Sequence, residues 1–467
     1  MSQRIEREFL EQVEKIKQQL ESTGLPFADL LDADQIDVIL SELGVEFRER
    51  VYTPDVVVGM FLFQALSDDA SCRNAVSKLI AQRIAEQRAP CSPNTGSYCT
   101  VRARLPEELL RRLARQMGQR LAHSADRAWQ WKGRVVKVVD GTTVSMPDSE
   151  ANQQAFPQQG AQRRGLGFPI ARLVVIFSLA VGTALDMAIG PYQGKQTGEN
   201  ALFRSLWDIS LSAGDVLTGD RCYCSSVDIA GLTRRQVDVV LRKHQLRPTD
   251  FRRGQRLGKH DHLVTWRKPQ QRPEWMDAET YASLPAQLTL REVRVTVADR
   301  GMRVRHLVIV TTLVSPRQFS REEIAHLYRQ RWNAELDLRS IKSTLKMDVL
   351  RTETPEMVRK EVWVHLLAYN LIRLKMAQAA ASAGLLPREI SFKGAVQAVA
   401  AFAVHGLTGG QDVSCEAVLL ATIAYHQVGD RPDRYEPRAI KRRPKPHRLL
   451  TEPRHIARNR GPNKARA

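Results

Sequence analysis

Residues 328–342 read Tyr328-Arg-Gln-Arg331-Trp-Asn-Ala-Glu335-Leu-Asp-Leu-Arg339-Ser-Ile-Lys342, a run of good helix formers with no proline or glycine. At about 100° per residue in an α-helix, Tyr328, Arg331, Glu335 and Lys342 project within an arc of roughly 60°. One helix face therefore carries a lone carboxylate among cations. The same spacing is also typical of a solvated helix face with ordinary ion pairs, so alone it does not decide between a site and a surface.

An apolar stripe lies beside this face, offset by roughly 80°. Its members are Leu327, Ala334, Leu338, Ile341 and Leu345. Such a stripe docks a helix on a core, so we expect the polar face to point into a cleft.

The composition favours a nucleic-acid-binding protein with more than one domain. The 467 residues are too many for one ordinary core and indicate two or three domains. A formal charge of +19 favours nucleic acid as the partner, because bound cations release condensed counterions; an anionic membrane surface is the second candidate. No uninterrupted apolar run reaches about 18 residues and the first residues are charged, so we expect no membrane contact and a cytoplasmic, nucleoid-associated protein. The six cysteines show no CxxC pair and no zinc-site spacing, and we interpret them as reduced thiols.

The order of patterns along the chain predicts four regions. Residues 1–128 form an all-α domain, either DNA-binding or supporting, with helices expected over 6–20, 33–43, 56–66, 75–86 and 106–122. Residues 129–380 form an α/β domain with a β-rich insertion at about 243–315. Helices follow in 381–430, and the proline-rich basic stretch 431–467 is expected to be a flexible tail that embraces a polyanion. A glutamine-rich loop at 152–162, followed by two arginines, lies in the second region.

Two strand-like runs each end in an aspartate. Asp140 follows the run 134–139, and Asp220 follows 215–219. Glu335 lies on a helix that must pack on the same sheet. Three converging carboxylates can hold two Mg²⁺ ions about 3.5–4 Å apart, which suits cleavage of a phosphodiester. An aspartate before a turn is often only a turn residue, so each aspartate alone is a weak signal.

The cations near Glu335 are expected to contact DNA. Arg331, Arg339 and Lys342 would bind phosphates and offset charge in the transition state, and Tyr328 would donate a hydrogen bond to a phosphate. Trp266, in the insertion, either stacks on an unpaired or flipped base or belongs to the core.

These motifs resemble the IS-four family of bacterial insertion-sequence transposases. The spacing of Tyr328, Arg331, Glu335 and Lys342 is similar to the family's Tyr-Arg-Glu-Lys signature. Asp140-Gly-Thr-Thr-Val-Ser-Met-Pro-Asp148 resembles the first aspartate block, Gly219-Asp220-Arg-Cys-Tyr-Cys224 the second, and residues 335–347 and 354–361 the third block and the stretch after it. The resemblance covers roughly residues 130–375.

The resemblance implies an RNase H-like catalytic core with a β-rich insertion, and Asp140, Asp220 and Glu335 as the metal-binding triad. It implies a DDE transposase that binds terminal inverted repeats, cleaves the 3′ strands with Mg²⁺, for which Mn²⁺ is the expected substitute, and joins them to target DNA. The expected partners are double-stranded DNA and, in the synaptic complex, a second copy of the chain. Some relatives excise through a hairpin helped by a tryptophan of the insertion, for which Trp266 and Trp275 are candidates. Two alternatives remain open: an RNase H-like nuclease without strand transfer, and a non-catalytic DNA-binding regulator.

Overall fold

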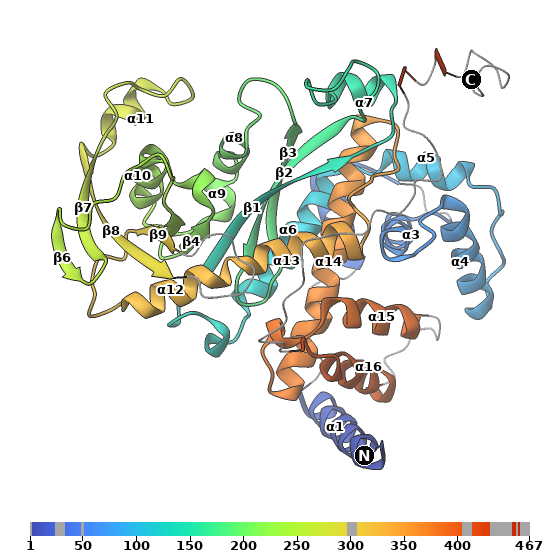
Figure 1. The fold of residues 1–467 in the computed structure, drawn as a ribbon. Helices are drawn as coiled ribbons and strands as arrows, with labels where there is room; N and C mark the ends of the chain where they lie inside the picture. The colour runs from blue at the N-terminus through green and yellow to red at the C-terminus, as the bar shows by residue number, and fades with distance from the viewer. Residues whose placement is uncertain are drawn as a thin grey trace.

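The computed structural model describes residues 2–23, 33–47, 51–296, 306–403, 413–429, 451–453 and 456–457. Nine strands in this part of the chain form one sheet, in the order β3-β2-β1-β4-β5-β9-β8-β7-β6 (Figure 1). Helices cover the sheet and extend beyond it on one side. The fold is therefore mixed α/β, as the sequence predicts.

Five strands form the half of the sheet that carries both aspartates. β1 (Val136–Ser145), β4 (Val216–Gly219) and β5 (Asp238–Arg242) are parallel neighbours. β2 (Ile170–Ser178) and β3 (Ala184–Pro191) form the predicted antiparallel hairpin beside β1. Helices cover both faces, so these strands consist of nearly continuous apolar residues instead of alternating with polar ones.

The β-rich insertion continues the same sheet. β6 (Gln255–Gly258), β7 (Asp261–Arg267), β8 (Gln287–Thr296) and β9 (His306–Thr311) pair antiparallel, and β9 joins β5 with Val240 opposite Thr311. A small apolar cluster, which includes Met276 and Val227, holds the loop around α11 (Ala278–Ser283) against α10 (Ser226–Arg234). Because β9 pairs with β5, backbone hydrogen bonds couple the insertion to the central strands.

The strand that carries Asp140 does not end there, contrary to the prediction. β1 continues to Ser145, and Asp140 lies in its middle. The antiparallel partner β2 pairs with β1 from Lys137 to Ser145, while the parallel partner β4 pairs only as far as Val139. One edge of β1 is thus free of β4 from Asp140 onward, although the strand continues.

The first region consists of helices, as predicted. They are α1 (Ser2–Thr23), α2 (Ala33–Glu42), α3 (Pro54–Leu66), α4 (Cys72–Ala85), α5 (Gly96–Arg104) and α6 (Glu107–His123). The sequence does not predict α5, because Tyr98 alone is buried in it and no apolar periodicity results.

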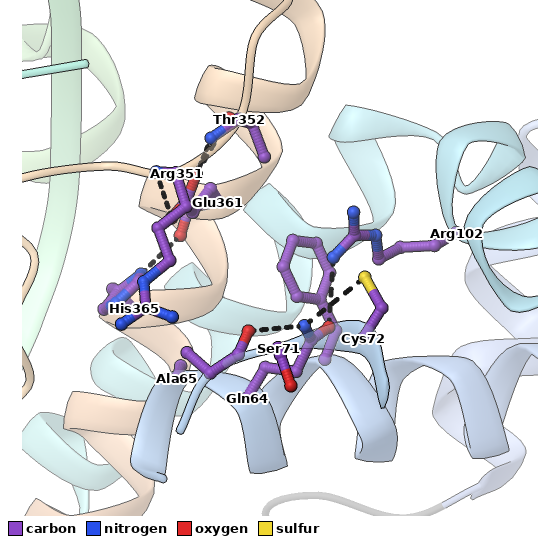
Figure 2. A pocket seen from close by; sticks show the side chains of 11 residues that line it. Gln64, Ala65, Ser71, Cys72, Arg102, Arg351, Thr352, Glu361 and His365 are labelled. Atoms are coloured by element: carbon purple, nitrogen blue, oxygen red, sulfur yellow. Dashed lines mark hydrogen bonds between the residues drawn. The ribbon is translucent and has the colours of Figure 1, made fainter. Parts of the chain in front are cut away.

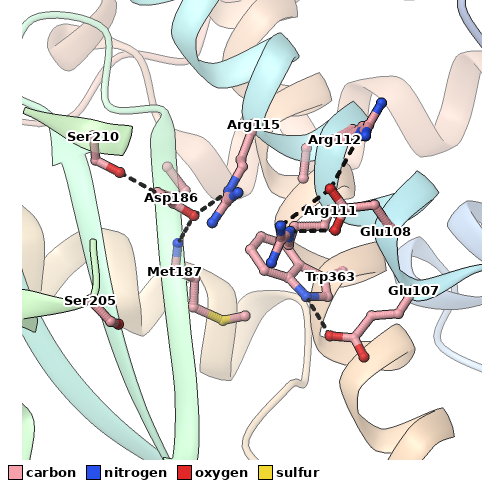
Figure 3. Close-up of polar contacts among 12 residues, drawn as sticks. Glu107, Glu108, Arg111, Arg112, Arg115, Asp186, Met187, Ser205, Ser210 and Trp363 are labelled. Carbon is pink, nitrogen blue, oxygen red and sulfur yellow. Dashed lines mark hydrogen bonds and ion pairs between the residues drawn. The ribbon is translucent and has the colours of Figure 1, made fainter. Parts of the chain in front are cut away.

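Helix α6 packs directly on the sheet. A Cβ atom on Gly118 would lie 2.1 Å from the carbonyl oxygen of Ala184 in β3, so only glycine permits this approach. Figure 3 shows Arg115 of α6 reaching Asp186 of β3, with 2.5 Å between Nε and Oδ1. Asp186 is buried and also accepts a hydrogen bond from the Ser210 hydroxyl at 2.7 Å. The N-terminal helices and the sheet therefore share one core.

Helix α14 (Pro355–Ala383) forms the spine of the C-terminal part. Thr354 caps its start, proline occupies its first turn, and Gly384 ends it with φ +67°. Helices α15 (Phe392–Ala403), α16 (Val413–Tyr425) and α1 gather at its C-terminal end (Figure 1). No helix in the described ranges is both long enough and apolar enough to cross a membrane. Most of the predicted basic tail, 431–467, lies outside the described residues.

Candidate active site

Residues 328–342, the signature segment, are helical but do not form one regular α-helix. α12 (Arg321–Gln330) ends before Arg331, α13 (Trp332–Arg339) follows at once, and a π-helical turn covers Ser340–Thr344. Arg331 has helical φ and ψ angles. Its carbonyl oxygen, however, accepts a hydrogen bond from the Ala334 N–H, only three residues ahead, whereas an α-helix has a spacing of four. At the other end, the Ser340 hydroxyl donates to the Leu336 carbonyl at 2.9 Å, a local bond that competes with the helix ladder. The prediction of one regular helix is therefore wrong at both ends of α13.

The apolar stripe beside the signature segment is confirmed. All five predicted members are buried, with 0–6% of their surface exposed: Leu327, Ala334, Leu338, Ile341 and Leu345. They dock α12 and α13 on the central core. This docking turns the adjacent polar face of the segment toward β1, where Arg331 approaches Asp140.

Arg331 connects the two carboxylates that α13 and β1 bring together. Its Nη2 lies 2.5 Å from Oε1 of Glu335, and its Nη1 lies 3.8 Å from Oδ2 of Asp140. The Arg331 side chain is only 14% exposed, so little solvent screens these charges. Asp140 and Glu335 therefore share one guanidinium, which lies between them.

Asp220 lies beside Asp140 on the neighbouring strand. Val139 of β1 pairs in register with Gly219 of β4, so Asp140 and Asp220 are the next residues of two parallel chains about 5 Å apart. Arg242, at the end of β5, approaches Asp220 with 3.8 Å between Nη1 and Oδ1. Asp220 therefore lies next to Asp140 at the end of β4, and Asp140 shares the Arg331 guanidinium with Glu335.

A fourth carboxylate, Glu199, was missed by the sequence reasoning. It lies in the first turn of α8 (Glu199–Arg204), and its side chain packs against Gly141. A Cβ atom on Gly141 would lie 2.7 Å from the Glu199 carboxyl carbon. The sequence did contain one sign of Glu199, which is the glycine after Asp140. A glycine within a strand often marks a place where another part of the molecule comes close to the backbone. The helix that supplies Glu199 could not be located from local sequence.

Burial, together with neighbouring carboxylates, raises the pKa of two groups in this site. The pKa of Asp140 is raised to about 6, mainly by burial; the Gly141 amide and Arg331 oppose the rise, whereas Glu335 and Glu199 contribute to it. Burial also raises the pKa of Tyr223, and Glu199, Asp140 and Asp220 add to that effect. The Tyr223 hydroxyl is buried and has no hydrogen-bond partner among the described residues.

The donor set fits a hard divalent cation in its chemistry. Arg331 lies beside the carboxylates of Asp140 and Glu335, and those of Glu199, Asp140 and Asp220 act on the buried, unpartnered Tyr223 hydroxyl; carboxylate oxygens are the ligands that hard cations prefer. No three carboxylate, histidine or cysteine side chains in the described ranges are close enough to share one ion, and Arg331 lies between two of the carboxylates. The carboxylates would therefore have to draw together to hold metal.

The other predicted residues of the signature segment differ in exposure. Tyr328 is buried, and Arg331 lies with its guanidinium carbon 6.0 Å from the ring centre. Burial raises the pKa of Tyr328 to about 12, so its hydroxyl is protonated at neutral pH. Arg339 is exposed and Lys342 is half-buried, and no ion pair engages either side chain within the described part of the chain.

Trp266 is a buried member of the insertion. Its ring is 7% exposed, its Nε1 donates to Glu292 at 3.1 Å, and the Arg247 guanidinium lies 4.1 Å from the ring centre. The half-buried Trp275 is similarly covered by Arg204, at 3.7 Å. An arginine occupies one ring face in both cases, and base stacking by either tryptophan stays a prediction.

A buried ion-pair cluster anchors α13 from behind. Asp337 is fully buried and pairs with Arg373 of α14 and with Arg388, which approaches both its oxygens at 2.8 Å. Arg388 also donates to the carbonyls of Leu179 and Ser178 at the end of β2. Since β2 pairs with β1, this cluster sets the position of Glu335 relative to Asp140.

The chain after the signature segment is fixed by Glu361 of α14. Its carboxylate accepts hydrogen bonds from the Arg351 and Thr352 amides at 3.0–3.1 Å. Figure 2 shows this contact in a cavity of about 210 Å³ between α3, α4 and α14. The Glu361 side chain therefore holds the loop that follows Lys342 by its backbone amides.

Comparisons with known proteins identify the family of the chain. The family described as "Transposase DDE domain" matches residues 131–371, just over half of the chain. Over 429 residues, 89% of this chain and 91% of the relative, the chain is 29% identical to transposase InsG for insertion sequence element IS4 of Escherichia coli strain K12. A segment of 82 residues, 18% of this chain and 22% of the relative, is 35% identical to the transposase for insertion sequence element IS421 of Escherichia coli. A piggyBac transposase synaptic complex with hairpin DNA, solved by cryo-EM, has a TM-score of 0.40 at 10% identity, covering 85% of this chain and 82% of that one.

The protein is a DDE transposase, an enzyme that cleaves and joins DNA. Enzymes of this class depend on divalent metal ions. The chain belongs to the IS-four family of insertion-sequence transposases.

Proposed function

We propose that this transposase moves its own insertion sequence by a cut-and-paste reaction. It binds the terminal inverted repeats, cleaves the 3′ strands and joins them to target DNA. The observation that supports this best is the position of Asp140 next to Asp220 of the neighbouring strand, together with the Arg331 guanidinium that it shares with Glu335. A non-catalytic regulator would not need this arrangement.

Asp140, Asp220 and Glu335 would hold two Mg²⁺ ions, with Glu199 beside them. The bound ions would lower the pKa of an attacking water or 3′-hydroxyl and stabilise the leaving oxygen. Arg331 would turn from the carboxylates to a DNA phosphate, and its planar guanidinium suits two phosphate oxygens. Lys342 and Arg339, which lack ion-pair partners within the described ranges, would hold the backbone on either side.

The architecture around this site supports a finer description of the fold. We propose that β3-β2-β1-β4-β5 with α13 is an RNase H-like core and that residues 129–380 are the catalytic domain, with 1–128 and 381–430 as helical regions. The basic tail at 431–467 would bind DNA. Two copies would meet on DNA, because two element ends must be brought together, and the reaction would take place in the cytoplasm, where the nucleoid lies.

The test uses the full chain and a donor plasmid that carries the coding region with its natural flanking DNA. We expect Asp140→Asn, Asp220→Asn and Glu335→Gln each to lose strand cleavage while binding to the flanking DNA is kept, since the basic surface is unchanged. Asp348→Asn, an exposed residue just beyond the signature segment, is the control and should cleave normally. Full nicking by any of the three variants would remove that residue from the triad.

Joining is measured in the same reaction with a second plasmid as target. Products in which the released 3′ ends are covalently joined to the target support transposition. Cleavage by the wild-type protein without such products would instead indicate a nuclease without strand transfer.

A further inference from the structure

A large polar cavity lies beyond the end of the strand that carries Asp140. Its volume is about 1140 Å³, and its wall begins at Pro147, two residues after β1 ends at Ser145. The glutamine-rich loop and α7 (Glu150–Ala155) form most of the wall. Figure 1 shows α7 at the end of β1 that points away from α12.

Two glutamines hold this loop in shape. The Gln158 side-chain carbonyl oxygen accepts from the Gly165 and Gly167 amides at 2.9 and 3.2 Å, and its Nε2 donates to two loop carbonyls at 3.1 Å. Gln153 Nε2 donates to Asp148 and to the Gly167 carbonyl at 2.7 and 2.9 Å. The loop therefore has a fixed framework built from its own side chains.

Four other glutamines line the cavity, and their side chains take no part in this framework. They are Gln154, Gln159, Gln162 and Gln193. Across the described ranges, no hydrogen bond joins their side-chain amides to another residue. Each amide offers two donors and one acceptor, the complement that a nucleobase edge requires. The framework holds the backbone of the loop that carries Gln159 and Gln162, so this loop presents unpaired amides at the cavity wall.

The charges of the cavity wall indicate which part of a DNA molecule it would bind, the base edges or the phosphates. Among the described residues, the wall contains the carboxylates of Asp148, Glu150 and Glu353 and one cation, Arg164. A phosphate site would need the opposite balance. Glutamine pairs with adenine and acidic side chains accept from the cytosine amino group, so the wall matches bases in a groove.

The cavity is mechanically joined to the active site. Ser145 N–H donates to the Asp348 carbonyl at 3.1 Å, and the Ser149 hydroxyl donates to the Glu353 carbonyl at 2.6 Å. Both acceptors belong to the loop that follows the signature segment. Asp140 lies about 20–25 Å from the wall along β1, which is about six or seven base pairs of DNA.

We propose that this cavity binds base edges of the element's terminal DNA about six base pairs from the cleaved phosphate and so contributes to recognition of the inverted repeat. The inference rests on the proposed function, since it needs DNA in the active site. It adds a site for sequence recognition that is separate from the catalytic carboxylates.

The test compares base preference in three full-length proteins: the wild type, the double variant Q154A/Q193A, and the control Q270A/Q271A, which changes two exposed glutamines of the insertion. Each is incubated with a library of 30-base-pair duplexes of random sequence, and the bound fraction is sequenced. Cleavage of the selected duplexes in Mg²⁺ locates the cleaved phosphate. Equal melting temperatures establish that the variants are folded.

We expect Q154A/Q193A to lose preference in one short block about five to eight base pairs from the cleaved phosphate, by roughly 5- to 150-fold per discriminated base pair, with the rest of the motif unchanged. The control should keep the wild-type motif. An unchanged motif in Q154A/Q193A would overturn the inference, as would a loss of self-association without a change in base preference, which would assign the cavity to protein contact. A wild type that selects no motif and cleaves nothing would instead contradict the proposed function.

Discussion

Replacing Asp337 with alanine should strongly destabilise the protein, because the change leaves two guanidinium groups without their counter-ion. Asp337 is fully buried, and the Arg373 and Arg388 side chains that it pairs with are 6% and 18% exposed. Removing one partner of a buried ion pair costs about 3–5 kcal/mol. We expect a loss of this size in the free energy of unfolding.

The corresponding change in melting temperature follows from the size of the chain. Unfolding entropies of about 2.1 cal/mol/K per residue give roughly 1 kcal/mol/K for 467 residues that melt as one unit. Asp337→Ala should therefore lower the melting temperature by about 3–5 °C in a circular-dichroism melt. Asp337→Asn keeps the shape but loses the charge, and should lose about 1.5–3 kcal/mol.

The matched control is Asp348→Ala, an exposed aspartate just after the signature segment. Its effect should stay within about 0.5 kcal/mol, as for most surface substitutions. A melting temperature for Asp337→Ala within about 1 °C of this control would show that the buried cluster contributes little net stability. The inference that it sets the position of Glu335 would then lose its energetic basis.

Three further perturbations test other parts of the molecule. Gly141→Ala should abolish cleavage, measured on a nicked-plasmid gel, because the new Cβ atom would lie 2.7 Å from the Glu199 carboxyl carbon; Gly59→Ala, where a Cβ atom meets nothing within 4 Å, should cleave normally. Gly118→Ala should destabilise the fold by about 1–3 kcal/mol or more in a thermal melt, because its Cβ atom would overlap a β3 carbonyl at 2.1 Å; a melting temperature equal to that of Gly59→Ala would contradict the tight docking of α6. Deleting residues 438–467 should weaken DNA binding and flatten its dependence on salt, because several phosphate contacts go at once; an unchanged slope of log affinity against log salt would show that the tail does not touch DNA.

Much of the site was predictable because it lies in local patterns. Helical periodicity identified the buried stripe from Leu327 to Leu345, and the spacing of Arg331 and Glu335 at four residues placed them on one helix face, where they form an ion pair. The two aspartates were identified because each directly follows a strand-like run, and runs of this kind are typical of buried parallel strands. These signals depend on neighbours within a few residues of one another.

The features that the sequence did not predict depend on distant partners. Asp140 lies within β1 and not at its end, because β2 continues where β4 stops, and pairing partners are invisible in a single strand. Glu199 enters the site from α8, about sixty residues after Asp140, through the space left by Gly141. Asp337 is an acidic residue, so local sequence gives no reason to expect it to be buried. It is buried because it pairs with Arg373 and Arg388, which lie far along the chain.

The choice of arginine at position 331 follows from the geometry of the two carboxylates. Glu335 lies one helical turn away on the same segment, while Asp140 belongs to a strand, so a single cation must span a gap between two elements. The guanidinium does this with separate nitrogens, Nη2 toward Glu335 at 2.5 Å and Nη1 toward Asp140 at 3.8 Å. A lysine ammonium is one point charge and cannot present two fixed donors in a plane. Because the same planar fork also matches phosphate oxygens, one side chain can balance the carboxylates in the free protein and turn to the DNA backbone when substrate is bound.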